Sequence, residues 1–136
     1  MSDDEFGTDG GNNNGGGSKS HQLVRYSRVS ADLDAIFDLL SVARLRYVLY
    51  HLYGMNSDVT ETEAVVDAVC EYEAAGTERA DPPSRNQVRI DLHHSKLPRL
   101  NAAGLVDYDP RQNEIRFYHS PSLEEWLEHA RHMEFE

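Results

Sequence analysis

Apolar residues recur at helical spacing in separate stretches of this sequence, and this periodicity constrains the fold more than any other feature. The pattern i, i+3, i+4, i+7 predicts helices over 33–40, 45–52 and 123–130. A further helix is predicted to begin at Thr60, because Thr60 and Glu63 have the spacing of a capping pair. Each such helix buries one stripe of side chains, so the sequence predicts a mainly helical domain.

Residues at the expected helix ends support these boundaries. Ser30 is placed to cap the first helix. Gly54 stands where a residue in the left-handed conformation closes the second helix, and Gly76 ends the third. Ser122 and Glu125 repeat the capping spacing, so we expect them to open the last helix.

A fourth helical segment carries most of the functional argument. It opens at the capping pair Ser84 and Gln87, and Pro98 is expected to kink it or restart it as a short turn. Ile90 and Leu97 are expected on its buried side. At about 100° per residue, its basic side chains fall within roughly 80° of arc on the other side: Arg85, Arg89, Lys96 and Arg99.

A β-hairpin is predicted directly after this segment. Gly104 ends the helix, residues 105–108 and 114–118 alternate as strands, and 109–113 have the composition of a turn. Helices followed by one hairpin indicate a winged helix. The predicted fold is therefore mainly α with a small β-hairpin, a winged helix-turn-helix with an extra N-terminal and an extra C-terminal helix.

The chain divides into one tail and one domain. Residues 1–20 are rich in Gly, Asn and Asp and have little to bury, so they are expected to form a disordered tail. Residues 30–136 are expected to form a single winged-helix domain. Its core covers 32–118, and its C-terminal helix covers about 121–135.

The charge balance is unusual for a protein that would bind an acidic partner. The 136 residues carry 13 Lys and Arg against 24 Asp and Glu, a net charge of -11. The two lysines are Lys19 and Lys96, a composition typical of salt-adapted, halophilic proteins. At molar salt the Debye length falls to about 3 Å, so this charge does not exclude DNA. Asp91 is the only acidic residue between Ser84 and Ala103, which makes that stretch locally basic.

Two stretches of the chain carry a resemblance to known proteins. The sequence LPRLNAAGLVDYD at 97–109, together with LDAIFDLLSVARLRYVLYHL at 33–52, resembles an uncharacterised haloarchaeal winged-helix family of unknown function. More distantly, it is similar to the ArsR-like and MarR-like regulators, whose recognition helix is followed by Ala-Gly-Leu-Val and the wing. The resemblance covers about residues 32–118 and implies a DNA-binding fold.

These observations predict a DNA-binding transcription regulator that recognises double-stranded DNA. The segment from about residue 84 would lie in the major groove, with the hairpin 105–118 as the wing. Contacts to base edges or phosphates are expected from Arg85, Asn86 and Arg89. Contacts to phosphates are expected from Lys96 and Arg99. Arg111, at the tip of the wing, is placed to enter the minor groove or to contact the flanking backbone.

Other functional classes are weaker. A winged-helix protein–protein interaction adaptor without DNA binding is the alternative, because the same fold serves both roles. No enzyme activity and no cofactor are expected, since the sequence has no glycine-rich phosphate loop and no nucleophile motif. No metal site is expected either, because His129 and His132 lack a third ligand and Cys70 is alone.

The remaining expectations concern location and assembly. No run of about 18 apolar residues and no signal-peptide pattern is found, so we expect a cytoplasmic protein without membrane association. The amphipathic C-terminal helix either packs back on the domain or joins two copies in a homodimer.

Overall fold

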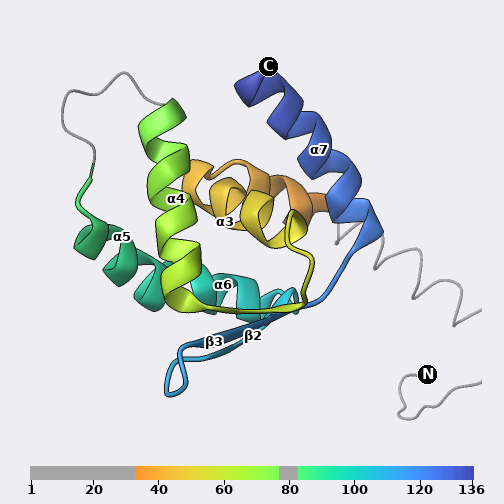
Figure 1. Ribbon diagram of the computed structural model, residues 1–136. Helices are drawn as coiled ribbons and strands as arrows, with labels where there is room; N and C mark the ends of the chain where they lie inside the picture. The colour runs from red at the N-terminus through yellow and green to blue at the C-terminus, as the bar shows by residue number, and fades with distance from the viewer. Residues whose placement is uncertain (1–32, 77–82) are drawn as a thin grey trace, which may run out of the picture. The chain divides into compact units, whose positions relative to one another are not determined.

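Seven helical segments and three strands follow one another along residues 33–76 and 83–136, the parts of the chain that the computed structural model describes (Figure 1). From Ile36 to Glu136 they form one compact unit. A helical stretch over 33–40 comes first. It is followed by α3 (Ala43–Tyr53), β1 (Val59–Glu61), α4 (Thr62–Gly76), α5 (Arg85–Asp91), the π-helical turn η1 (Leu92–Lys96), α6 (Leu97–Ala102), β2 (Val106–Asp109), β3 (Glu114–Phe117) and α7 (Pro121–Phe135). The expected tail and the expected cap at Ser30 lie outside the described residues.

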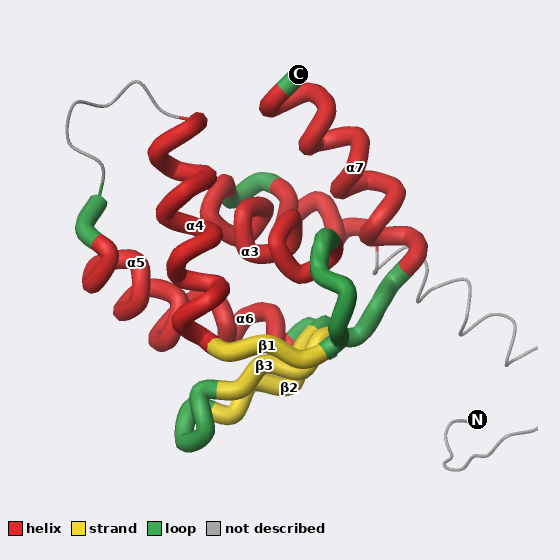
Figure 2. Tube along the Cα trace, in the orientation of Figure 1, coloured by secondary structure: helices red, strands yellow, loops and turns green. Residues whose placement is uncertain are grey.

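The three strands form one antiparallel sheet in the order β1-β3-β2 (Figure 2). Ile115 in the central strand is paired with Thr60 on one side and with Tyr108 on the other. The expected helix start at Thr60 is therefore wrong, because Thr60 lies in β1 and α4 begins two residues later. The β-branched residues Val59 and Thr60 suit a strand, and pairing with β3 outweighs the local capping pair.

The order of the elements is that of a winged helix-turn-helix fold. α4 and the α5–α6 segment follow β1, and the β2–β3 hairpin comes directly after α6. In Figure 2 the strands lie beside the lower end of α4, and the hairpin loop extends away from the helices. The helical stretch 33–40 and α7 are the extra helices at the two ends. The predicted fold class, mainly helical with a small sheet, is confirmed.

One apolar core holds these elements together. It takes side chains from every helix of the compact unit and from the sheet, and twelve of the larger ones are less than 2% exposed. Those twelve are Leu45, Leu49, Leu52, Leu92, Leu97, Leu100, Ile115, Leu123, Val48, Val65, Val66 and Val69. Burying each such side chain contributes on the order of 2 kcal/mol. The fold therefore depends mainly on the packing of the helices and the sheet around this core.

The ends of two helices differ from expectation. Gly54 has a right-handed conformation, with φ -90°, so it closes α3 without the left-handed turn that was expected. The last helix begins at Pro121, because Ser120 caps it by accepting a hydrogen bond from the N–H of Leu123. Ser122 is therefore inside the helix. Gly104 does have the expected left-handed conformation, with φ +78°, after α6.

α7 packs back on α3 through a polar contact and an aromatic cluster. Arg46 donates to both oxygens of Glu134 at 2.9 and 2.8 Å, and the Tyr50 hydroxyl donates to Glu134 at 2.9 Å. The aromatic cluster consists of Tyr47, Tyr50, Tyr72 and Phe135. This contact fixes the end of α7, while Met133 on the same helix stays 72% exposed.

Candidate nucleic-acid interface

The α5–α6 segment is held in place by a buried stripe with uneven spacing. Val88, Leu92, Leu97 and Leu100 are all fully buried, at steps of four, five and three residues. The step of five coincides with η1, where the N–H of Leu97 donates to the carbonyl of Leu92 instead of that of His93. Ile90 was expected in this stripe and is instead 51% exposed. The expectation is wrong because the wider turn changes which residues share a face.

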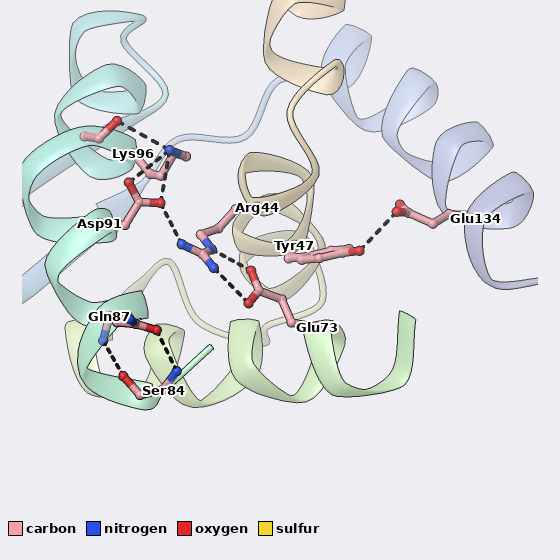
Figure 3. Close-up of polar contacts among 9 residues, drawn as sticks. Arg44, Tyr47, Glu73, Ser84, Gln87, Asp91, Lys96 and Glu134 are labelled. Atoms are coloured by element: carbon pink, nitrogen blue, oxygen red, sulfur yellow. Dashed lines mark hydrogen bonds and ion pairs between the residues drawn. The ribbon is translucent and has the colours of Figure 1, made fainter. Parts of the chain in front are cut away.

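Pro98 and the capping pair delimit this segment. Ser84 accepts from the N–H of Gln87, and the Gln87 side chain accepts from the N–H of Ser84, so the predicted capping box is present (Figure 3). Pro98 lies in the first turn of α6, a position that suits proline because its fixed φ matches the start of a helix. α6 does begin next to the proline, but the chain does not leave the helical conformation there, because Lys96 and Leu97 both have right-handed helical angles.

Arg85 and Arg89 point toward α4 and are bound there by carboxylates. Arg89 donates through Nε and Nη2 to the two oxygens of Glu63, at 2.8 and 2.9 Å. Arg85 donates through Nη2 to Glu63 at 2.6 Å and through Nη1 forms an ion pair with Asp67. Two arginines on α5 thus face two carboxylates on α4, which cancels the basic surplus expected from the sequence.

These pairs lie at the surface. The side chains of Arg85, Arg89 and Glu63 are 43%, 37% and 47% exposed, so water screens their attraction. The hydrogen bonds from Arg89, and then those from Arg85, lower the pKa of Glu63 to about 2. Glu63 is therefore charged at every physiological pH, and the guanidinium groups keep a carboxylate beside them.

A second ion cluster lies deeper, between α3, α4 and α5 (Figure 3). Arg44 donates to Glu73 at 2.5 and 2.9 Å and to Asp91 at 2.9 Å. Lys96 donates to Asp91 at 3.1 Å and is only 17% exposed. Burial opposes ionisation of Asp91, but the hydrogen bonds from Arg44 and Lys96 outweigh it and lower its pKa. Lys96 was expected on the outer basic face, and η1 turns it toward this inner cluster.

The other candidate residues are exposed, and of these Asn86 lies beside Arg85 and Arg89 while the rest lie on other elements. Asn86 is on the outer side of α5 and accepts from Nη1 of Arg89 at 3.0 Å. Arg99 on α6 donates to the carbonyl of Asp38 over a long distance, 3.5 Å. Arg111 is exposed in the turn of the hairpin. Arg116, which the sequence reasoning missed, is exposed on β3 and pairs with Asp58 at 3.4 Å.

The hairpin also carries acidic side chains. Asp107, Asp109 and Glu114 surround Arg116 in a shallow depression that also includes Asn101. The hairpin is joined to the α5–α6 segment by a hydrogen bond of 2.6 Å between Nδ1 of His93 and the Tyr108 hydroxyl. His93 is exposed and makes this hydrogen bond at the surface. This contact fixes the wing relative to η1.

Along 33–76 and 83–136, no group of three His, Cys, Asp or Glu side chains is arranged to hold a metal ion. In the same two ranges, no helix has the length and apolar character needed to cross a membrane.

The comparisons with known proteins concern the same part of the chain. A protein-family model described as a domain of unknown function (DUF7344) matches residues 37–116. That range runs from the helical stretch before α3 into β3 and contains every candidate residue named above. The comparisons with curated proteins and with solved structures found no match.

Proposed function

The chain belongs to the DUF7344 family, a domain of unknown function, and from its winged-helix geometry we propose that it is a DNA-binding transcription regulator. The observation that carries this proposal is that α5 follows α4 along the chain and leads through η1 and α6 into the β2–β3 hairpin. α5 is anchored by Val88, while Arg85, Asn86 and Arg89 keep part of their surface in water. An α-helix presented in this way fits the major groove.

The remaining candidates divide by their surroundings. Arg111, exposed at the wing tip, is assigned to the minor groove or the flanking backbone. Arg99 and Arg116 are assigned to phosphates, since both are exposed and weakly engaged. Lys96 is left out of the interface, because Asp91 binds its ammonium group inside the domain.

The acidic carboxylates near the interface set the conditions under which it works. Each exposed ion pair contributes at most about 1 kcal/mol, so exchanging one for a contact with DNA costs little. The net charge of -11 repels DNA at low salt, and this repulsion is screened at high salt. We therefore propose that the protein works in a salt-rich cytoplasm, as its composition favours.

A protein–protein adaptor is the second candidate, and one observation favours it. The arginines of α5 are engaged by Glu63 and Asp67, while Ile90 on the same helix is 51% exposed. An apolar side chain surrounded by neutralised charges suits a protein partner. The adaptor function and the regulator function differ in whether duplex DNA binds at all.

We also propose that the regulator pairs with a second copy through α7. Trp126 and Met133 are exposed one above the other on this helix, and Phe37 packs on Trp126 with ring centroids 5.2 Å apart. Two copies joined along this exposed apolar strip would present their α5 helices to two half-sites of DNA.

The test is a fluorescence polarisation assay with duplex DNA in molar potassium chloride. The wild type is expected to bind, and Arg85→Ala/Arg89→Ala is expected to weaken binding at least tenfold, on the order of 1.4 kcal/mol. Arg131→Ala on α7 is the control for loss of positive charge. Equal binding by the wild type and the double variant, or no binding by either, would favour the adaptor.

A further inference from the structure

Arg89 has donors that the described residues, 33–76 and 83–136, leave unused. A guanidinium group carries five N–H donors. In Arg89, Glu63 takes one from Nε and one from Nη2, and Asn86 takes one from Nη1. Within this part of the chain two donors remain, one on each terminal nitrogen, and the side chain is 37% exposed.

Arg85 is held in a different way, although both arginines lie on the same face of α5. Its two terminal nitrogens are bound to two different carboxylates, Nη2 to Glu63 and Nη1 to Asp67, and no contact of its Nε is found among the described residues. Glu63 therefore holds Arg89 by two nitrogens, Nε and Nη2, but holds Arg85 by one. The two-atom contact fixes the plane of the Arg89 guanidinium group, which gives its remaining donors a defined direction toward a ligand.

The chemistry of the free donors indicates one base. Guanine presents two acceptors, O6 and N7, in the major groove, and arginine contacts them with two parallel hydrogen bonds. We propose that Arg89 reads a guanine in this way, and that Glu63 and Asn86 are positioning residues that hold its guanidinium group in place. The inference rests on the proposed DNA-binding function and names the base and the residue that reads it.

Glu63 also explains why a base would be preferred to a phosphate. A phosphate carries a negative charge and is repelled by the carboxylate beside Arg89, whereas the guanine edge is a neutral acceptor. Contacts with phosphate lose affinity as salt rises, because they depend on counterion release. A paired arginine that contacts a base edge keeps its selectivity in the high salt that the composition favours.

The first experiment measures base preference. Wild-type protein selects duplexes from a randomised library in molar potassium chloride, and the selected consensus is then bound by Arg89→Lys and, as matched control, by Arg131→Lys on α7. Arg89→Lys keeps the charge but loses the paired hydrogen bonds, so preference for guanine at one position is expected to fall roughly tenfold or more. Arg131→Lys is the same chemical change away from the interface and is expected to change that preference less than about threefold.

The second experiment separates positioning from a purely structural role. Glu63→Gln is expected to let Arg89 meet a phosphate, which steepens the slope of log affinity against log salt by about one and reduces guanine preference. Glu71→Gln, at an exposed position of the same helix, changes the net charge equally and is expected to leave the guanine preference unchanged.

The outcomes distinguish this inference from the proposed function. Binding without any guanine preference, or a preference that survives Arg89→Lys, would overturn the inference and leave DNA binding intact. An unchanged salt slope and preference in Glu63→Gln would overturn the role of Glu63. Absence of duplex binding by the wild type would overturn both proposals.

Discussion

Two arginines of this protein make the same kind of contact in different surroundings. Arg44 binds Glu73 through Nε and Nη2, and Arg89 binds Glu63 through the same two nitrogens. The Arg44 side chain is 21% exposed and its Nη1 binds a second carboxylate, Asp91, whereas the Arg89 side chain is 37% exposed and its Nη1 binds the neutral Asn86. The comparison indicates that the exposed fraction of the side chain, more than the ion pair itself, distinguishes an arginine that holds helices together from one that can contact a partner.

The energetic consequence follows from solvent screening. An exposed pair gains little because water weakens the attraction and the side chains lose freedom. A partly buried pair costs much more to break, since removing one partner leaves the other charge without its hydrogen bonds. The inner cluster around Arg44 is therefore expected to determine stability, and the outer cluster around Arg89 to determine binding.

The largest effect is expected from breaking the inner cluster. Arg44→Ala leaves Glu73 and Asp91 unpaired at the interface of α3, α4 and α5, and the free energy of unfolding should fall by about 2 to 3 kcal/mol. Urea denaturation followed by circular dichroism measures this change. A loss below about 1 kcal/mol would show that the two clusters do not differ as the structure indicates.

A double-mutant cycle compares the two pairs directly. For Arg44 and Glu73 we expect a coupling energy of about 2 kcal/mol, and for Arg89 and Glu63 about 0.5 kcal/mol. Both cycles use alanine variants and chemical denaturation under the same salt conditions. Equal coupling energies in the two cycles would contradict the proposed division of roles.

Acid is expected to weaken the outer cluster in a defined pH range. The pKa of Glu63 is lowered from 4.5 to about 2 by its hydrogen bonds to the arginines. Its contribution to stability is therefore complete above about pH 4.5 and is lost as the pH falls toward 2. Because Glu63 is half exposed, this contribution should stay below about 1 kcal/mol. Carbon-detected NMR titration of the Glu63 carboxylate reports its pKa, and Arg89→Ala should return it toward 4.5.

The smallest effect is expected for the stability of Arg89→Ala. Removing an exposed ion pair should lower the free energy of unfolding by no more than about 0.5 kcal/mol. Thermal denaturation of this variant beside the wild type is the measurement. A much larger loss would mean that Arg89 is a structural residue of the α4–α5 contact, and its proposed role as a reader would lose support.

The sequence was sufficient for most of the fold. Apolar spacing located the helices, and the Ser84 and Gln87 pair located the start of α5, because both signals are local. It failed at β1, which is held by pairing with β3 more than fifty residues away. A short strand of this kind has little local pattern, so a capping motif at Thr60 was the stronger signal.

The candidate site was predicted less completely. Arg85 and Arg89 share a face, as helical spacing indicated, but Glu63 and Asp67 lie on another helix and no local pattern pairs them with α5. The positions of Ile90 and Lys96 were wrong because regular helical geometry cannot anticipate the wide turn in η1. A five-residue step between Leu92 and Leu97 was the available sign of it.

The wide turn at η1 has a consequence for how proteins of this architecture can diverge. One residue of an α-helix corresponds to a rotation of about 100°, so losing a single residue between Leu92 and Pro98 would swing α5 by roughly that angle relative to α6. The leucines of α6 would stay in the core while Arg85 and Arg89 faced a new direction. A change of one residue in length, with no change in the side chains themselves, would be enough to retarget the helix.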